Sequence, residues 1–528
     1  MTPALLGQSS ALPRSLISCF PWFWSQILFP GKLNASVRPR IWSGLMLIVL
    51  PGLLLYPRLS FLLLEPDESR YAQIPREMLQ RGDWIVPHLQ SQPYLDKPPL
   101  LYWLVMVSYK LFGVSEASAR LVPALAMHAT ILLTYFWGRR FVGERAAFWG
   151  ALLLSVAPGF MSIGRLLIID GLLAFLTNLA VFSVFEAIRG DRFRRNWWLL
   201  GAVAAGLAML TKGPVVLALL IPPVWLYRRM QSPTTAIGWK RLAEFLVVLA
   251  AVNAPWYVGM ALRKPAFLKY LFWDQNVIRF VQPFDHVRPV WFYVPVLLIG
   301  LVPGTFLLVG FCRYLFTGNP YRTQTRNPEL GFLLLAGLWC VLFFSISGSK
   351  LPTYILPAFP SLALALGAYV ASRWPIAPRL PAALAGGGFA LLMFLHHVAV
   401  PWYAHERSPM AEPERLAKYC PPEQTVICFP RTCDSVSFYL NRSDLKTTRS
   451  KNSQELVDML YEHKRTIVLF THRHSLDALK YVLPRDLMIA EVISFRRKND
   501  LGELFDVLSG ETPWGLCDLV VVENLKLK

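Results

Sequence analysis

Charged residues are concentrated in one segment of the chain, residues 65–100, which directly follows the first long apolar run. The segment contains Glu65-Pro66-Asp67-Glu68-Ser69-Arg70-Tyr71 and Tyr94-Leu95-Asp96-Lys97-Pro98-Pro99-Leu100. Carboxylates can accept a proton and cations can hold a phosphate, so the combination suits group transfer. A pair of acids in a loop is usually just solvated. Here several acids, two cations and a rigid Pro-Pro pair share one loop, and charges at the mouth of a membrane helix are costly to keep there. We therefore predict group transfer at a membrane surface.

Three further polar residues are expected on the same side of the membrane. Asp170 lies inside an apolar helix, where an acid is a functional candidate; the alternative is a structural salt bridge with Arg165. His286 can be a metal ligand, a hydrogen-bond donor or an ordinary surface histidine. Lys350 lies in a turn of small residues, Ser345–Leu351, where backbone N–H groups can approach an oxyanion. The alternative for that turn is a plain interhelical connection.

Taken together, these residues predict a site for a phosphate and an acceptor. The candidate phosphate-binding cations are Arg70, Lys97, Lys350 and Arg279, and the candidate acids that orient or deprotonate an acceptor are Asp67, Glu68, Asp96 and Asp170. No cytoplasmic loop carries a nucleotide-phosphate motif, so neither a nucleotide-sugar donor nor ATP coupling is supported. A lipid phosphate fits as the leaving group, because its anion lies at the interface and its tail lies along helices.

The elements that must position these residues are membrane helices. The 528-residue chain is 54% hydrophobic and 16% charged, whereas soluble domains carry about a quarter charged residues. Apolar runs lie at about 41–64, 119–138, 146–162, 166–188, 197–211, 213–227, 242–262, 291–312, 330–346, 352–371 and 380–400. These eleven runs predict a polytopic α-helical membrane protein with about 11–13 transmembrane helices. The run from Leu100 to Phe112 is too short to span comfortably and predicts an interfacial or re-entrant helix.

Charge divides the loops into two sets. The short loops rich in arginine and lysine are 139–145, 189–195, 228–241, 313–326 and 373–379, and they are expected in the cytoplasm with the basic tail 1–40. The other set faces outward and comprises loops 65–118, 263–290 and 345–351 with the short links 162–165 and 211–213. The net charge of +20 is therefore explained by topology, and nucleic acid is not needed as a partner. The expected location is a bacterial inner membrane, crossed several times, with residues 41–401 as the catalytic membrane domain and its site on the periplasmic side.

The C-terminal region, residues 402–528, has a different composition and predicts a small periplasmic α/β domain. Its expected strands are 425–428, 435–440, 466–470, 487–493 and 519–522, and its expected helices are 452–463 and 475–482. It contains no catalytic motif, so we interpret it as a cap on the membrane site. Cys420, Cys428, Cys433 and Cys517 match no zinc pattern; disulfides are possible outside the cytoplasm, but their pairing cannot be deduced from sequence.

Several of these motifs together resemble one known superfamily. They are the acidic pair after the first helix, Gly82-Asp83-Trp84, Asp96-Lys97-Pro98-Pro99-Leu100, Arg165 with Asp170, and Gly348-Ser349-Lys350-Leu351-Pro352-Thr353-Tyr354. Over residues 41–400 the chain resembles the GT-C glycosyltransferases, and within them the bacterial aminoarabinose transferases that modify lipid A, relatives of the protein O-mannosyltransferases. The combination of motifs is specific, although each motif alone is not.

The resemblance implies a GT-C fold, a polyprenyl-phosphate sugar donor, an extracytoplasmic active site and an inverting displacement. It implies that Asp67 is the principal catalytic acid and that Asp170 supports the site; Glu68 is predicted from its place beside Asp67 as a further catalytic acid. Arg70, Lys97 and Tyr354, together with Lys350, would hold the donor phosphate. A divalent metal shared by Asp96 and His286 is a further implication, and no other cofactor is expected.

One motif departs from the aminoarabinose transferases. They carry Glu-Lys-Pro-Pro where this chain has Asp96-Lys97-Pro98-Pro99, and the shorter acid leaves the donor sugar and the acceptor open. Lipid A is the first expected acceptor, with a protein or another glycan as the alternative. A transporter of lipid-linked sugars is the rival of a different class, and it predicts charges across the bilayer midplane and internal repeats. The charges here gather at one face, which favours an enzyme.

Overall fold

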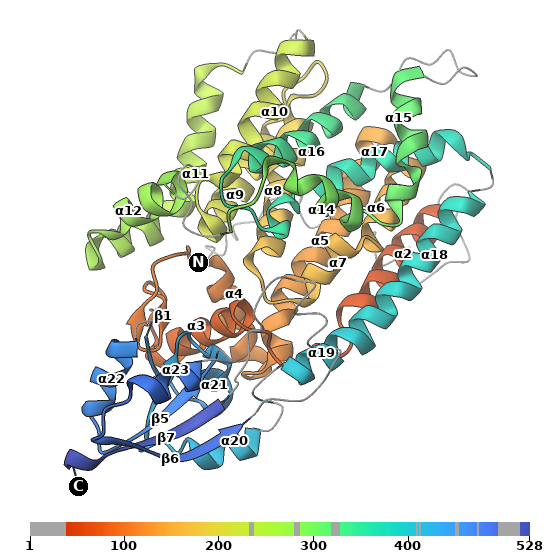
Figure 1. Ribbon diagram of the computed structural model, residues 1–528. Helices are drawn as coiled ribbons and strands as arrows, with labels where there is room; N and C mark the ends of the chain where they lie inside the picture. Colours follow the sequence, from red (N-terminus) through yellow and green to blue (C-terminus); the bar gives the residue numbers. More distant parts are fainter. Residues whose placement is uncertain are drawn as a thin grey trace, which may run out of the picture.

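The computed structural model describes residues 38–231, 237–278, 286–317, 328–376, 378–407, 410, 413–448, 453–471, 475–494 and 518–527. Within these residues the chain forms a bundle of helices with a small α/β domain against one end of it (Figure 1). Both parts were predicted from the sequence, and their arrangement determines which loops meet at the candidate site.

The bundle is built from helices whose buried faces are almost wholly apolar. They are α2 (Arg38–Leu55), α5 (Glu116–Val142), α6 (Glu144–Ser155), α7 (Pro158–Met161), α8 (Ile169–Ile188), α9 (Arg195–Lys212), α10 (Val215–Gln231), α11 (Trp239–Arg263), α14 (Tyr293–Gly300), α15 (Leu308–Thr317), α16 (Pro328–Ile346), α17 (Ala358–Arg373), α18 (Arg379–Phe394) and α19 (Val400–Arg407). Shorter 3₁₀, α or π segments connect them: η2 (Ser162–Arg165), α12 (Phe267–Lys269), η3 (Tyr270–Ile278), η4 (Val290–Phe292), η5 (Gly304–Leu307), η6 (Pro352–Ile355) and η7 (Leu395–Ala399).

The centre of the bundle is α8, which packs against α5, α9 and α10, while α17 packs against α6 and α16. Glycines permit the closest of these contacts. A Cβ on Gly367 of α17 would overlap the carbonyl oxygen of Ala146 in α6, and a Cβ on Gly150 would lie 2.8 Å from the carbonyl oxygen of Ala363. Small residues at crossing points are the usual means by which membrane helices approach each other closely.

Each of the eleven predicted apolar runs contains a helix, but fewer helices are long enough to span by themselves. In the described part of the chain, five helices are long and apolar enough to cross a membrane, or up to seven if each of two bent pairs is one span. One pair, Glu144–Ser155 with Pro158–Arg165, bends by 65°, and the other, Val290–Gly300 with Gly304–Phe316, bends by 98°. The remaining runs form helices that are shorter or end in charged residues, such as α17 and α9.

The first outer loop forms its own structure at one end of the bundle. It contains α3 (Asp67–Arg81), the two-residue strands β1 (His88–Leu89) and β2 (Gln92–Pro93), which pair antiparallel, and α4 (Leu100–Phe112). Acidic residues in its first turn and the left-handed Gly82 at its end explain the limits of α3. The predicted short helix 100–112 is confirmed as α4.

The C-terminal domain is a mixed five-stranded sheet with helices on both faces. Its elements are α20 (Pro413–Tyr419), β3 (Thr425–Phe429), α21 (Asp434–Leu440), β4 (Lys446–Thr447), α22 (Ser453–Tyr461), β5 (Arg465–Phe470), α23 (Ser475–Val482), β6 (Leu487–Ser494), β7 (Asp518–Asn524) and η9 (Leu525–Leu527). The strand order is β4-β3-β5-β7-β6, with β3 parallel to β4 and β5, and β7 antiparallel to β5 and β6. Alternate residues of β3, β5 and β7 enter two separate apolar cores, one on each face, as the two-residue period of a strand requires.

One element of this domain was predicted wrongly, and the state of its cysteines was left open. Residues 435–440, expected as a strand, form helix α21, whose Asp434 lies in the first turn and whose end is the left-handed Asn441. Alternation of apolar residues over so short a stretch does not distinguish the two states. The cysteines Cys420, Cys428 and Cys433 are buried and free, and Cys517 lies outside the described residues.

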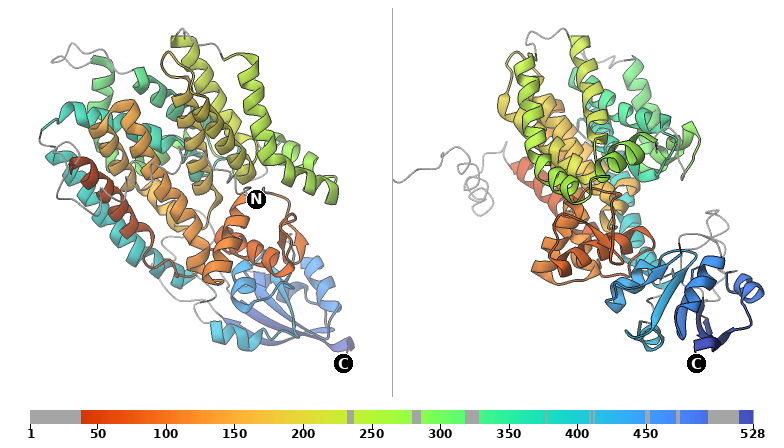
Figure 2. Two further views of the ribbon diagram at one scale, coloured as in Figure 1. Left: turned by 180° about the vertical axis from the view of Figure 1, so that it is seen from behind. Right: turned by 90° about the vertical axis from the view of Figure 1, so that its left-hand side faces the viewer.

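The domain is fastened to the first outer loop through α21 and the residues after it. In both Figure 1 and Figure 2 the domain lies directly beside α3 and β1, and α21 contacts α3. Hydrogen bonds cross this boundary: the Leu63 N–H donates to the Tyr439 hydroxyl (3.0 Å), the Gln80 amide to Asn441 (3.1 Å), and the Ser91 hydroxyl to the Ser443 carbonyl (2.9 Å).

Candidate active site

Two helix ends bring an acid and a base together beside the first outer loop. Asp170 lies in the first turn of α8 and Lys212 in the last turn of α9, and these are the helix ends that favour an anion and a cation. Because α8 and α9 pack against each other, Lys212 Nζ lies 2.5 Å from Asp170 Oδ1. Gly213, with a φ of +82°, ends α9 immediately after the lysine. Asp170 is only 4% exposed, so this pairing neutralises it.

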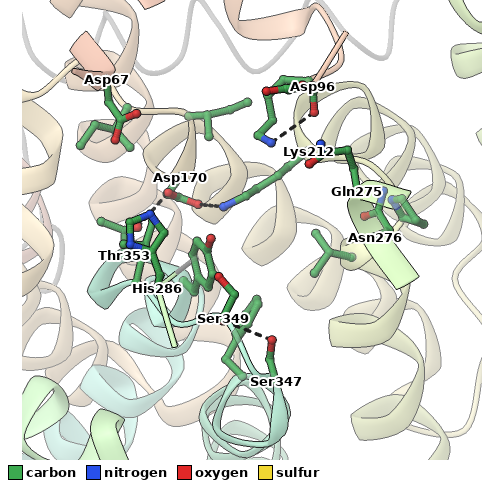
Figure 3. Close-up of a pocket in the computed structure, with 18 of the residues that line it drawn as sticks. Asp67, Asp96, Asp170, Lys212, Gln275, Asn276, His286, Ser347, Ser349 and Thr353 are labelled. Atoms are coloured by element: carbon green, nitrogen blue, oxygen red, sulfur yellow. Dashed lines mark hydrogen bonds and ion pairs between the residues drawn. The ribbon is translucent and has the colours of Figure 1, made fainter. Parts of the chain in front are cut away.

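The segment after α16 completes the surroundings of this pair. The Thr353 hydroxyl donates to Asp170 Oδ2 at 2.8 Å, and the Tyr354 ring lies under Lys212, with Nζ 4.1 Å from its centroid. Figure 3 shows Thr353 beside Asp170, with Lys212 reaching across from the other side. Both Asp170 oxygens are therefore occupied, which suits a residue that holds other groups in place.

A cavity of about 710 Å³ opens over these residues. Its polar lining consists of Asp67, Arg70, Tyr71, Tyr94, Asp96, Lys97, Asp170, Lys212, Gln275, Asn276, His286, Ser347, Ser349, Thr353 and Tyr354. Its apolar lining includes Val215 and Ala218 of α10, Leu271, and Phe343 and Phe344 of α16. The cavity thus joins a charged end beside the outer loop to an apolar wall of bundle helices. It brings together Asp67, Arg70, Asp96, Lys97, Asp170, His286 and Tyr354 from the residues predicted by sequence; Arg279 lies outside the described residues.

Asp67 is the accessible carboxylate of the site. It begins α3, its side chain is 49% exposed, and its described ion-pair partner is Arg70, with 3.6 Å between Asp67 Oδ1 and Arg70 Nη1. Burial would lower the pKa of Arg70, but Tyr94, Asp434 and Asp67 raise it by more, so the guanidinium stays charged. An exposed carboxylate beside a permanent cation can orient or deprotonate an incoming group.

Asp96 and Lys97 lie on the other side of the cavity. The Tyr270 hydroxyl donates to Asp96 Oδ1 at 2.6 Å, and the Gln275 amide donates to the Tyr270 hydroxyl at 2.8 Å. Lys97 Nζ donates to the Asp96 carbonyl oxygen at 3.2 Å. The Asp-Lys-Pro-Pro motif therefore places an oriented acid and a cation together at the cavity wall.

Glu68, predicted as a catalytic acid, lies elsewhere. It is 2% exposed and absent from the cavity lining, and both its oxygens accept hydrogen bonds from Arg120, from Nε and Nη2, each at 2.8 Å. The backbone N–H groups of Leu64 and Leu167 donate to the same carboxylate. Its neighbour Asp67 faces the cavity because adjacent residues on a helix point in different directions. Glu68 thus joins the outer loop to the bundle and does not reach the cavity.

Lys350, predicted to hold a phosphate, also points away from the cavity. It is 3% exposed, and its Nζ donates to the carbonyl oxygens of Arg288 (2.9 Å) and Ser347. Its backbone N–H donates to the His286 carbonyl at 3.0 Å, so this N–H is not available to an oxyanion. Lys350 fastens the turn 345–351 to the loop that carries His286.

The proposed salt bridge between Arg165 and Asp170 does not form. Arg165 is 1% exposed and donates to four backbone carbonyls, those of Leu54, Leu55, Pro57 and Arg58. It therefore binds the end of α2, while Lys212 takes the place expected for it beside Asp170.

Comparisons with known proteins agree with this arrangement. Residues 43–271 match the family described as dolichyl-phosphate-mannose-protein mannosyltransferase. The undecaprenyl phosphate-alpha-4-amino-4-deoxy-L-arabinose arabinosyl transferase 1 of Sodalis glossinidius is 36% identical over 341 residues, and the corresponding transferase of Serratia proteamaculans is 34% identical over 339. Each alignment covers 62% of this chain and 59% of the relative, so the match spans about three fifths of the relatives' length.

Solved structures extend the similarity over almost the whole chain. ArnT from Cupriavidus metallidurans bound to undecaprenyl phosphate superimposes with a TM-score of 0.72, covering 92% of this chain and 98% of that one at 20% identity. The archaeal oligosaccharyltransferase AglB from Archaeoglobus fulgidus has a TM-score of 0.52 over 82% of this chain and 70% of its own, at 15% identity. The chain therefore has the fold of these two structures. It is a polytopic membrane protein with a C-terminal α/β domain, as the sequence predicted.

The divalent metal that the resemblance implies does not fit the described residues. Figure 3 shows Asp96 and His286 on opposite sides of Lys212, with His286 near Asp170 and Thr353. No group of three or more His, Cys, Asp or Glu side chains that can hold a metal ion occurs in the described ranges. Asp96 also accepts a hydrogen bond from Tyr270. Asp96 and His286 therefore do not form a metal site in the described part of the chain.

Lys212 is the main residue of the candidate site that the sequence did not predict as a site residue. A lysine followed by glycine at the end of an apolar run is an ordinary helix C-terminus signal, which does not by itself indicate function. The predicted topology could have identified Lys212. It placed residues 211–213 on the same side of the membrane as the buried Asp170, which needs a counter-ion. Thr353, Tyr270 and Gln275 carried no such signal, because hydroxyl and amide side chains in loops are common.

Proposed function

We propose that this protein is an inverting glycosyltransferase that takes a sugar from a polyprenyl-phosphate donor. The observation that carries the proposal is the cavity, in which Arg70, Lys97 and Lys212 meet an apolar wall formed by α10 and α16. A lipid-linked phosphate needs this combination, a cationic end for its anion and an apolar surface for its tail. The names of the sequence relatives, undecaprenyl phosphate-aminoarabinose transferases, support 4-amino-4-deoxy-L-arabinose as the first sugar to test.

In this proposal Arg70, Lys97, Lys212 and Tyr354 surround the donor phosphate. The bond between the anomeric carbon and the phosphate oxygen breaks, and its electron pair leaves with the lipid phosphate, whose charge the cations stabilise. Asp170 positions Lys212 and thereby supports the leaving group indirectly.

Asp67 acts on the acceptor in this proposal. Where the acceptor is a hydroxyl, Asp67 orients it and accepts its proton while the acceptor oxygen bonds to the anomeric carbon. Where the acceptor is an ionised phosphate, such as that of lipid A, Asp67 instead stabilises the developing positive charge on the sugar. Lipid A phosphate is the acceptor proposed first, because the sequence motifs resemble those of the aminoarabinose transferases that modify lipid A.

The proposed setting is a bacterial inner membrane. Residues 1–40 lie in the cytoplasm in this proposal, residues 41–401 form the catalytic domain, and residues 402–528 lie in the periplasm beside the site. The segregation of arginine and lysine between alternate loops supports this orientation.

The test is mass spectrometry of lipid A and of envelope proteins from cells with the wild-type chain, with the Asp67→Asn variant, and without the protein. A pentosamine-sized addition to lipid A phosphate that requires wild-type protein is the expected result. Unchanged glycoconjugates in cells that express folded protein would contradict the enzyme and favour a transporter.

A second acceptor class is favoured by a specific observation, the match of residues 43–271 to protein mannosyltransferases. In that case the sugar is lost from an envelope protein, or another glycan, and lipid A is unchanged. The donor and the leaving group stay the same, because the cavity is the same, and Asp67 then accepts the proton of the acceptor hydroxyl.

A further inference from the structure

One residue of the C-terminal domain reaches the rim of the proposed active site. Asp434 begins α21, is fully buried, and lies on the boundary where the domain packs against α3. Its Oδ2 is 3.8 Å from Arg70 Nε. Arg70 in turn lines the cavity, so Asp434 connects the C-terminal domain to a residue of the site.

The Arg70 guanidinium is held between two carboxylates from different parts of the chain. Asp67 faces Nη1 at 3.6 Å from within the cavity, and Asp434 faces Nε from behind it. The two acids differ in exposure: the Asp67 side chain is 49% exposed and that of Asp434 is 1% exposed. Asp67 is therefore available to an acceptor, whereas Asp434 is not.

The Arg70 guanidinium is the described ion-pair partner of the buried Asp434. Both carboxylate oxygens are inaccessible to solvent and have no hydrogen bond of good geometry in the described part of the chain, although the Gln90 and Thr432 side chains lie near enough to favour the charged form. The other charged groups near it, Glu65 and Glu77, are acids and cannot compensate it. A buried carboxylate is unfavourable for folding unless its charge is paired, and Arg70 is the cation that pairs with Asp434.

We propose that Asp434 is a positioning residue for the transfer reaction, holding the Nε edge of Arg70 so that its Nη groups stay directed at the donor phosphate. This inference rests on the proposed function. When Asp67 turns to the acceptor, Asp434 keeps the guanidinium in place, so the cation does not follow the catalytic acid. The C-terminal domain is then a structural part of the donor site and more than a cover for it.

The test is a double-mutant cycle on the full-length protein, with undecaprenyl phosphate as the binding probe and sugar transfer as the second readout. Asp434→Asn keeps the shape of the side chain and removes its charge. With Arg70 present, we expect this variant to weaken undecaprenyl phosphate binding and to lower kcat/KM, each by about fivefold or more. In the Arg70→Lys background, which keeps a cation but has no Nε edge, the same change is expected to cost less than twofold.

A merely structural role predicts a different pattern. In that case Asp434→Asn reduces binding by the same factor in both backgrounds, or reduces only the yield of folded protein, and either result overturns the inference. Asp444→Asn is the matched control, because Asp444 pairs with Arg442 inside the same domain and does not line the cavity. A wild-type chain that neither binds undecaprenyl phosphate nor transfers sugar overturns the proposed function and this inference together. If the wild-type chain is active and the effects of Asp434→Asn and Arg70→Lys are additive, the inference about Asp434 is overturned and the proposed function stands.

Discussion

At the scale of single residues, the site separates two carboxylates by their surroundings. Asp170 is buried and bonded to both Lys212 and Thr353, whereas Asp67 is half exposed and faces Arg70 at 3.6 Å. A residue that exchanges a proton or meets a developing charge needs access, and a residue that positions others needs fixed partners. Of the two carboxylates, only Asp67 is accessible enough to exchange a proton or to meet a developing charge.

We expect Asp67→Asn to lower the rate of sugar transfer by roughly 10²- to 10⁴-fold, because the amide can neither accept the proton nor carry the negative charge. Donor binding should stay within about threefold of wild type. The measurement is single-turnover transfer with binding of undecaprenyl phosphate determined in parallel. Asp191→Asn is the control, because Asp191 is exposed between α8 and α9, at the ends of these helices opposite to Asp170 and Lys212. Turnover like that of wild type would remove Asp67 from the mechanism.

Glu68 is expected to matter for stability instead. Glu68→Gln leaves Arg120 buried without its counter-ion, a change that typically costs about 3–5 kcal/mol. Thermal unfolding should show a clear loss of stability, while the transfer rate per folded molecule stays close to wild type. The double variant Glu68→Gln with Arg120→Met should recover part of the loss, since no charge is then left unpaired. A folded and stable Glu68→Gln variant without activity would instead return Glu68 to the catalytic group.

These residues show how far sequence reasoning can reach at a site. Acids and cations beside a membrane helix are unusual, so the loop containing Asp67, Arg70, Asp96 and Lys97 was recognisable. Which neighbour on a helix faces a cavity depends on packing, so Glu68 was wrongly grouped with Asp67. The partner of Asp170 is set by how α8 and α9 are aligned, and the nearest cation in sequence, Arg165, is not the nearest in space.

At the scale of elements, close helix packing depends on particular glycines. We expect Gly367→Ala to destabilise the protein strongly, because the new Cβ would overlap the Ala146 carbonyl oxygen in α6 and force α17 away. Gly386→Ala in α18 is a matched control: its Cβ would have nothing within 4 Å, and alanine favours a helix by about 0.5–1 kcal/mol. Thermal unfolding in detergent distinguishes the two, and equal stability of both variants would contradict the packing argument.

The contact between the outer loop and the C-terminal domain is expected to depend on pH. Glu65 is buried beside Asp434, and burial first, then the charge of Asp434, raises the pKa of Glu65 to about 7. The folded state therefore holds a proton that the unfolded chain releases near pH 4.5, so stability falls as the pH rises between about 4.5 and 7. We expect a lower Tm at pH 8 than at pH 5.5.

Glu65→Gln tests this expectation, because it removes the charge. The variant should flatten the fall in Tm with pH and raise the Tm at pH 8 by about 2 °C or more. The Ser435 N–H, which donates to Glu65 Oε1 at 2.6 Å, can donate to the glutamine oxygen as well. An unchanged pH dependence in this variant would show that Glu65 is not the group that titrates.

Most elements were predictable, and the exceptions have physical reasons. Long apolar runs and the short run 100–112 identified helices because length alone separates them from strands. Residues 435–440 were misassigned because six residues with alternating apolar side chains satisfy both patterns. The bends of 65° and 98° could not be predicted, because the helices break inside stretches of sequence that are apolar without interruption.

At the scale of the whole molecule, the proposed orientation makes a prediction about access. A cysteine introduced at Lys480, in the C-terminal domain, should react with a membrane-impermeant maleimide in intact spheroplasts. A cysteine at Arg192, between α8 and α9, should react only after the membrane is opened. The exposed Cys312 and the two cysteines outside the described residues, Cys19 and Cys517, are first replaced by alanine in both variants. Labelling of position 192 in intact spheroplasts would reverse the proposed topology.

The hydrogen bonds between α21 and the first outer loop have a consequence for evolution and for engineering. Leu63, Gln80 and Ser91 on one side meet Tyr439, Asn441 and Ser443 on the other, so the two segments form one structural unit although some 350 residues separate them. A chimera that exchanges only residues 402–528 with those of a relative would join surfaces that were never matched. Exchanging the outer loop together with the domain would transfer a complete unit, and recombination between such genes should be tolerated only when both pieces come from the same parent.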